Sequence, residues 1–456
     1  MTAAGDRTQP SVLGAIADAA RYPRPVWRSE RAYVLASIAG VVGLGNLWRF
    51  PYMAGLHGGG TFVLAYVVCA AVIAIPLATV ESASGNLVRR SPVGVFRSAG
   101  GRLGAIVGWG VIGVTVAIMS YYFVVTGWTL GYAIDAFRNS VVTFREFTDG
   151  MSSLWLFLAV GAAVCLLLLR DVSAIERASL VLLPLLVLIV VGLTVYSLTL
   201  DGAGEAREFY FGLEAQRLAD PGLWSAAAGQ AFYSLGIGQG VLIAYGSYLP
   251  SGTNLIRSTG LIAATNSSIS IIAGLMVMGF VFTFDLPADA GSELSFTVFP
   301  RIFQELPAGE FLAVGFFVLL FVAGFTSCLG GAVVVMAAAR DELHLSRKVA
   351  ARWVAGVIVL LGIPSALSFT SVGLTVAGRP FLDRVDQATG SGVIVVLGLL
   401  GAALLARKLP TRALAAAFDS DEWRVGAVRL GPRALIGWSA VLPALAAVFY
   451  VLGLLL

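Results

Sequence analysis

The stretch at residues 40–50, GVVGLGNLWRF, interrupts an otherwise apolar segment. It holds three glycines, Gly40, Gly43 and Gly45, and Asn46 and Arg49 follow them. Glycine costs about 1 kcal/mol per interior helix position relative to alanine. The stretch therefore predicts a break in a helix. The reason for such a break has to be found in the rest of the sequence.

The composition is that of a membrane protein. The chain has 456 residues, of which 58% are hydrophobic and 12% charged, and its mean hydropathy is +0.87. Soluble domains have about 25% charged residues. The apolar stretches approach the ~20 residues of a spanning helix and exceed the ~10 of a barrel strand. We expect a lipid bilayer as partner and no nucleic acid. The net charge of +4 then indicates how the chain is oriented in the membrane.

Apolar runs bounded by charge, glycine and proline predict an all-α polytopic protein with eleven transmembrane helices. The predicted spans are 27–57, 61–87, 103–136, 152–170, 175–199, 223–248, 255–284, 311–340, 346–369, 388–406 and 433–456. Arginines gather at 21–31, at 89–102 and at 407–412, whereas the loops 201–220 and 285–310 are more acidic. The positive-inside bias then predicts a cell-membrane protein with a cytoplasmic N terminus and an external C terminus.

Reactive side chains are scarce in these spans. Cys69, Cys165 and Cys328 lie in apolar stretches without CxxC spacing, which predicts neither a disulfide framework nor a zinc site. Apart from Glu81, ionisable groups lie near segment ends or in loops. We therefore expect no enzyme. The carboxyl group of Glu81 is a functional candidate by default, and proton coupling is one interpretation of it.

A second glycine-rich break, YSLGIGQG at 233–240, lies five spans after the first. Small residues also serve as packing points between membrane helices, which is the plain alternative. Paired interrupted spans instead are typical of inverted-repeat transporters, where unwound backbone lines a cavity. Half-helix amides suit a carboxylate and half-helix carbonyls suit sodium. The residues thus predict a transporter of a carboxylated substrate coupled to sodium.

Several motifs agree in order and spacing. GLGNLWRFPY, HGGGTF, IPLATVE, AFYSLGIGQG, FTSCLGG and DELHLSRK together closely resemble the neurotransmitter:sodium symporter family, as a prokaryotic member similar to its bacterial leucine transporter. The resemblance runs from Trp27 through the tenth span. It implies a 5+5 inverted-repeat core and sodium-coupled symport by alternating access. The implied organisation is 1–26 as a cytoplasmic segment, 27–199 and 200–406 as the two repeats, and 407–456 as a basic loop with helix 11.

The resemblance implies two sodium sites and one substrate site. The first sodium site would use Val41, Asn46, Ser234, Asn266 and the substrate carboxylate. The second would use Ala39, Val42, Ala323, Thr326 and Ser327. The substrate would contact Gly43, Leu44, Gly45, Ile118, Tyr122, Tyr233, Gly236, Gln239, Ser327 and Gly331.

Gly43 bears on the kind of substrate. Monoamine-transporting members have an aspartate at this position, so the glycine implies a neutral amino acid that brings its own carboxylate. Gly236 and Gly331 replace larger groups in the pocket, which favours a large or aromatic side chain, and Gln239 could bond a polar atom at its far end. A γ- or β-amino acid or a taurine-like osmolyte is the alternative, because it also suits these glycines.

The same register implies gates and an anion site. Arg49 and Asp386 match the outer gate pair, and Arg24 and Asp341 match the inner pair. Neutral donors, without a carboxylate, stand where chloride-dependent members bind the anion: Tyr66, Gln230, Ser234, Asn266 and Ser270. We therefore expect chloride as a second coupled ion. A non-transporting sensor is disfavoured by the intact gate residues, and the oligomeric state is left open.

Overall fold

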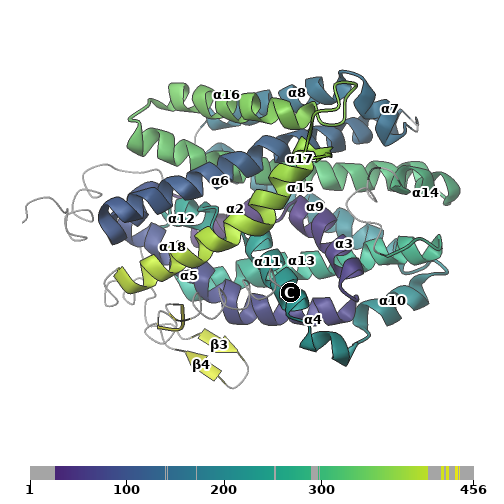
Figure 1. The fold of residues 1–456 in the computed structure, drawn as a ribbon, viewed down its shortest axis with the longest axis horizontal. Coiled ribbons are helices and arrows are strands. Elements are labelled where there is room, and N and C mark those ends of the chain that lie inside the picture. Colours follow the sequence, from purple (N-terminus) through teal and green to yellow (C-terminus); the bar gives the residue numbers. More distant parts are fainter. Residues whose placement is uncertain are drawn as a thin grey trace, which may run out of the picture.

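The structure is a computed structural model. It describes residues 26–138, 140, 142–170, 172–250, 253–288, 296, 298–408, 423–425, 428–430, 437–439 and 441. Nearly all of these belong to helices, as the all-α prediction requires (Figure 1). Two short antiparallel pairs are the strands among the described residues.

The first half of the chain forms helices with short π or 3₁₀ turns between some of them. They are α2 (Glu30–Val41), η1 (Gly45–Arg49), α3 (Phe50–Leu56), α4 (Gly60–Cys69), η2 (Ala70–Ala74), α5 (Ile75–Val88), α6 (Pro92–Phe137), α7 (Phe144–Asp149), α8 (Ser152–Leu168), α9 (Val172–Ser197), α10 (Ala203–Phe211) and η3 (Ala215–Ala219).

The second half continues in the same way and adds the strands. Its elements are α11 (Pro221–Leu235), α12 (Val241–Gly246), α13 (Leu255–Thr283), α14 (Phe299–Glu305), α15 (Gly309–Glu342), α16 (Arg347–Ala366), β1 (Thr375–Val376), β2 (Arg379–Pro380), α17 (Phe381–Asp386), η5 (Gln387–Val393), α18 (Ile394–Lys408), β3 (Trp423–Val425) and β4 (Val428–Leu430).

Helices fall within the first ten predicted spans. Among the described residues seven helices are long and apolar enough to cross a membrane, and the bent pair Glu30–Val41 and Gly45–Leu56 makes an eighth. The eleventh predicted span, 433–456, falls almost wholly outside the described residues, so the total of eleven and the repeat boundaries stay predictions. Two details differ from expectation. The basic loop before the third span is largely helical, because α6 begins at Pro92 and kinks at Gly100–Gly101. The stretch 407–432 contains the β3–β4 hairpin.

A packed frame surrounds the two broken helices. The long helices α6 and α15 pack along each other, and α8 and α16 cover them at one side of the molecule (Figure 1). The opposite side carries α4 and α5, and α2, α11 and α12 lie between (Figure 1). Gly330 of α15 lies so close to α2 that a Cβ would stand 3.0 Å from the Gly40 carbonyl oxygen. This close approach places the α2 break directly beside α15.

Candidate functional site

The first break lies where the glycines predicted it. The helix α2 ends at Val41, and Val42 is extended, with φ −74° and ψ 113°. The chain re-enters helical geometry through Leu44 and η1, and the two halves meet at 54°. Backbone groups between the halves cannot form the usual helix ladder and need other partners.

Side chains supply those partners. The Gly43 amide donates to Asn46 Oδ1 at 2.9 Å, and the Leu44 amide donates to Tyr122 Oη at 2.7 Å. A Cβ at Gly43 would collide with Ser327 Oγ and Tyr122 Oη. An aspartate at this position would therefore need the surrounding helices to move apart.

The second break separates α11 from α12. Gly236, Gly238 and Gly240 have φ values of +65°, +81° and +73°, which favour glycine because other residues are strained there. The Gly238 amide donates to Glu81 Oε1 at 3.1 Å. Glu81 is 1% exposed, so this buried carboxyl group accepts from the unwound backbone of the second break.

A buried polar cluster joins the two breaks. Asn46 Nδ2 lies 3.0 Å from Ser234 Oγ, 2.9 Å from Asn266 Oδ1 and 2.7 Å from Ser270 Oγ. Asn266 Nδ2 also donates to Ser234 Oγ at 2.6 Å. Four residues from three separate spans are thus brought together, although nothing in their periodicity predicted it. Asn46, Ser234 and Asn266 are candidates for the first sodium site. Ser234, Asn266 and Ser270 are candidates for the anion site.

Of the other two candidate anion donors, Tyr66 borders this cluster and Gln230 does not. Tyr66 Oη lies 3.5 Å from Ser234 Oγ and 3.1 Å from Ser267 Oγ. Gln230 turns toward the first break instead, because its Nε2 donates to the Gly45 carbonyl at 2.8 Å and its Oε1 accepts from Arg49. In this conformation Gln230 ties the outer end of the break to Arg49.

A small cavity lies between the breaks. Its volume is about 30 Å³. Eight of the ten predicted substrate contacts line it: Gly45, Ile118, Tyr122, Tyr233, Gly236, Gln239, Ser327 and Gly331. The other two, Gly43 and Leu44, do not line it, although the Leu44 amide donates to Tyr122, which does.

Met119 also lines the cavity and was not predicted. A Cβ at Gly331 would lie 2.7 Å from Met119 Cγ and 2.9 Å from Met119 Cε, and closer still to the sulfur. The space that Gly331 vacates is therefore filled by a flexible thioether. The space beside Gly236 is more open, because a Cβ there would meet Val241 and Val41 at 3.5–3.8 Å.

The predicted second sodium site lies between α2 and α15. Ser327 Oγ donates to the Val42 carbonyl at 3.2 Å. Thr326 Oγ1 bonds back to the carbonyls of Val322 and Ala323 at 3.0 and 3.1 Å, as hydroxyls inside helices often do. Of the five predicted ligands, Val42 and Ser327 are thus in contact between the two helices, and Thr326 and Ala323 are in contact within α15.

Polar and aromatic side chains cover the cavity at the predicted outer end. The Arg49 guanidinium, 5% exposed, lies 4.9 Å from the Tyr233 ring centroid. Tyr121 Oη donates to Asp386 Oδ1 at 2.7 Å and lies 3.3 Å from Tyr233 Oη. Both predicted outer gate residues therefore meet around Tyr233, and the connecting hydroxyl belongs to Tyr121, which was not assigned to the gate.

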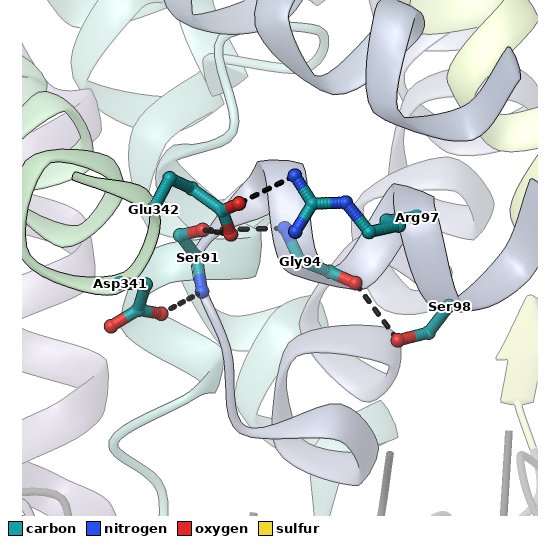
Figure 2. A network of polar contacts seen from close by, with 6 residues as sticks. All are labelled: Ser91, Gly94, Arg97, Ser98, Asp341 and Glu342. Atoms are coloured by element: carbon teal, nitrogen blue, oxygen red, sulfur yellow. Dashed lines mark hydrogen bonds and ion pairs between the residues drawn. The ribbon is translucent and has the colours of Figure 1, made fainter. Parts of the chain in front are cut away.

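Aromatic side chains pack against one another at the predicted inner end. Trp27 packs on Tyr245 and Tyr248 with ring centroids 5.4 and 6.1 Å apart. Asp341 accepts from the Ser91 amide at 2.6 Å (Figure 2). The predicted inner partner Arg24 lies outside the described residues.

The neighbouring Glu342 strengthens the same junction. It forms an ion pair with Arg97 at 2.5 Å and accepts from Ser91 Oγ at 3.3 Å (Figure 2). The end of α15 is therefore tied to the start of α6 by two adjacent carboxylates.

Comparison with known proteins decides the family. The sequence model of the Sodium:neurotransmitter symporter family matches residues 24–149 and 142–408. The chain belongs to this family. It is therefore a sodium-dependent transporter and not an enzyme, as the sequence predicted.

A solved structure shares the fold of this symporter, and several relatives are named as sodium-dependent transporters. The structure described as MhsT in complex with L-phenylalanine matches with a TM-score of 0.86 at 30% identity, and the match covers 94% of this chain and 100% of that one. An uncharacterized sodium-dependent transporter of Haemophilus influenzae is 30% identical over 84% of this chain and 88% of its own. The mouse sodium-dependent neutral amino acid transporter B(0)AT3 is 26% identical over 83% of this chain and 76% of its own.

Met119 and Ser267 beside the candidate site were not predicted, and Tyr121 was not assigned to the gate, for one reason. Met119, Tyr121 and Ser267 lie on helices whose other faces are also apolar or hydroxyl-rich. Because such residues occur on several faces of these helices, periodicity does not single out the face that turns toward the cavity. The adjacency of Tyr121 to Tyr122 was the available signal for the gate.

Proposed function

We propose that this symporter carries a neutral amino acid with a large or aromatic side chain together with sodium, and that chloride accompanies them, by alternating access. The observation that carries the proposal is the crowding at Gly43. Because a Cβ there would collide with Ser327 and Tyr122, no protein carboxylate can enter at this point without a rearrangement. The substrate would have to supply its own.

The carboxylate would bind at the first break. The amides of Gly43 and Leu44 now donate to side chains, Asn46 and Tyr122. Exchanging a side-chain acceptor for a carboxylate replaces neutral hydrogen bonds by charge-assisted ones, which are roughly twice as strong. The hydroxyl of Tyr122 would then be released to donate to the same carboxylate.

The side chain would enter between Ile118, Gly236 and Gly331. The mobile thioether of Met119 is the adjustable wall, since methionine adapts to irregular gaps. MhsT, which matches this fold closely, was solved with L-phenylalanine, and B(0)AT3 is named for neutral amino acids. Both support the proposed class.

Sodium would bind at two places. Asn46, Ser234 and Asn266 offer neutral oxygens near the substrate carboxylate, and Val42, Thr326 and Ser327 offer them on the other side of the break. Hard cations prefer such oxygens. An ion next to the carboxylate would couple substrate binding to sodium through their mutual attraction.

Chloride would balance this charge. Ser270 and its neighbours present hydroxyl and amide donors and no carboxylate, at side chains that are 0–1% exposed. A buried ion needs such partners because an unpaired charge is very costly away from water. The proposed anion would lie against Tyr66, Ser234 and Ser270.

Uptake by proteoliposomes tests the function. We expect labelled L-phenylalanine to accumulate under an inward sodium gradient and not under a potassium gradient. Competition with unlabelled amino acids would rank the substrate class. Displacement by γ-aminobutyrate, β-alanine or taurine, with none by aromatic amino acids, would instead favour the osmolyte-type alternative.

A further inference from the structure

We propose that Gln239 selects a substrate whose aromatic side chain ends in a hydroxyl group, so that L-tyrosine binds more tightly than L-phenylalanine. This preference rests on the proposed function and narrows its substrate class. Gln239 belongs to the unwound segment between α11 and α12 and lines the central cavity. Its side chain brings a carboxamide, which can both donate and accept hydrogen bonds, into the wall that faces the substrate.

The other polar groups of the cavity wall already have partners. Five polar side chains line the cavity: Tyr122, Tyr233, Ser234, Gln239 and Ser327. Tyr122 accepts from the Leu44 amide, Ser327 donates to the Val42 carbonyl, Ser234 accepts from Asn46, and Tyr233 Oη lies 3.3 Å from Tyr121 Oη. The side-chain amide of Gln239 hydrogen-bonds none of the described residues. A polar group that is left unpaired away from water is costly, so a ligand that pairs with this amide gains affinity.

The amide of Gln239 presents surface to the cavity. Gln239 is 7% exposed, as are the cavity-lining Tyr122 and Ser327 at 6% and 8%, whereas Ile237 and Leu242 do not line the cavity and are 0% exposed. Neither polar atom of the unpaired Gln239 amide is among the fully buried atoms without a partner, so both keep accessible surface. The donor and the acceptor of this amide can therefore meet a ligand.

Backbone contacts fix the position of Gln239. Its amide donates to the Gly236 carbonyl at 3.2 Å, and its carbonyl accepts from Thr115 Oγ1 at 2.8 Å. The next residue, Gly240, has φ +73°, and a Cβ there would lie 2.7 Å from Pro92 Cγ. These contacts use only backbone atoms of the segment. The side chain of Gln239 can therefore be replaced without removing any of them.

The rest of the wall suits the ring of such a substrate. Ile118, Met119 and Val241 are apolar, and Gly236 and Gly331 leave side-chain volume out of the wall. Aromatic rings favour apolar surroundings, and a phenol hydroxyl can donate to and accept from a carboxamide. A site that bonds a substrate hydroxyl discriminates against the analogue without it, because the polar group of the site then stays unpaired. An unsubstituted ring would leave the Gln239 amide without a partner and without water.

Calorimetric titration of the purified full-length protein in sodium chloride tests this preference. The probes are L-tyrosine, L-phenylalanine and 4-fluoro-L-phenylalanine, whose fluorine is close to a hydroxyl in size but donates no hydrogen bond. We expect L-tyrosine to bind about tenfold more tightly than either analogue. In Gln239→Leu, L-tyrosine should weaken by about tenfold or more, and L-phenylalanine should strengthen because the new side chain is apolar. The order of the two affinities should therefore reverse.

Gln216→Leu is the matched control, because Gln216 is exposed in η3 and does not line the cavity; it should leave all three affinities unchanged. Thermal unfolding establishes that each variant is folded, and the comparison of L-tyrosine with 4-fluoro-L-phenylalanine in the original chain needs no variant. Equal affinities for these two probes, or an equal loss for all three in Gln239→Leu, would overturn the role of Gln239 and leave the proposed function standing. Binding of none of the three would overturn both.

Discussion

Replacing Gly331 with alanine would place a methyl group against Met119 inside the central cavity. Its Cβ would lie 2.7 Å from Met119 Cγ and 2.9 Å from Cε, and closer still to the sulfur. Ordinary carbon contacts are 3.5–4.0 Å, so the thioether must retreat by roughly 0.5–1 Å or more. Both residues line the cavity, and we expect the displaced side chain to take up space that a large substrate needs.

The size of the effect follows from the packing. The cavity volume is only about 30 Å³, so there is little empty space into which the displaced atoms could move. Overpacking a filled site costs typically 1–3 kcal/mol, which corresponds to a roughly 5- to 150-fold loss of affinity. The loss should be greatest for L-phenylalanine and L-tryptophan and least for L-alanine. Alanine is also the better helix former by about 1 kcal/mol, so the helix itself should not be weakened.

Binding of labelled L-phenylalanine to the purified protein, with L-alanine and L-tryptophan as competitors, measures this change. Gly113→Ala is the matched control, since nothing lies within 4 Å of a Cβ at that position of α6. The double variant Gly331→Ala/Met119→Ala should recover most of the lost affinity, because the colliding thioether is gone. An equal loss for all three amino acids, or no recovery in the double variant, would refute this account of the pocket.

Three further predictions address the ions and the gate. Uptake in chloride-free gluconate with sodium held constant should fall, and Ser270→Glu should remove the dependence; equal uptake in gluconate and chloride by the original chain would contradict the anion site. Glu81→Gln should keep uptake, because its amide oxygen can still accept from Gly238, whereas Glu81→Ala should lower thermal stability by about 1–3 kcal/mol; a pH dependence of uptake that disappears in Glu81→Gln would point to proton coupling. Tyr121→Phe removes a 2.7 Å bond to Asp386 and should speed release of bound label about tenfold or more, and an unchanged release rate would exclude this bond from the gate.

Much of the fold could be predicted because its signals are local. Glycine clusters, span lengths and flanking charges each act within about twenty residues, and the breaks at 42–44 and 236–240 lie where the glycines indicated. The motifs that resembled the symporter family identified it correctly. The extent of α6 was less accessible, because its kink at Gly100–Gly101 lets a helical segment precede the span that hydropathy detects.

The site was predictable as a set of residues but not as a network. Asn46, Asn266 and Ser270 belong to spans far apart in the sequence, and only packing brings their polar atoms within 3 Å. Met119 fills the cavity wall only because Gly331 has no side chain. The two residues lie on different spans, so no pattern within one segment could indicate their contact. Sequence reasoning expected Gly331 to enlarge the pocket, whereas in the structure Met119 occupies the vacated volume.

At the breaks in the helices, three backbone amides have side chains rather than backbone carbonyl groups as hydrogen-bond acceptors. Within a helix each amide bonds a carbonyl of the same helix, and freeing it means unwinding the chain. At the breaks the amides bond side chains instead: Gly43 to Asn46, Leu44 to Tyr122 and Gly238 to Glu81. A side chain can turn aside at the cost of a rotamer change, about 0.5–1.5 kcal/mol even when strained. The unwound amides are thus satisfied without a ligand. Under the proposed function they would exchange these acceptors for a substrate carboxylate while α6 and α15 keep their packing.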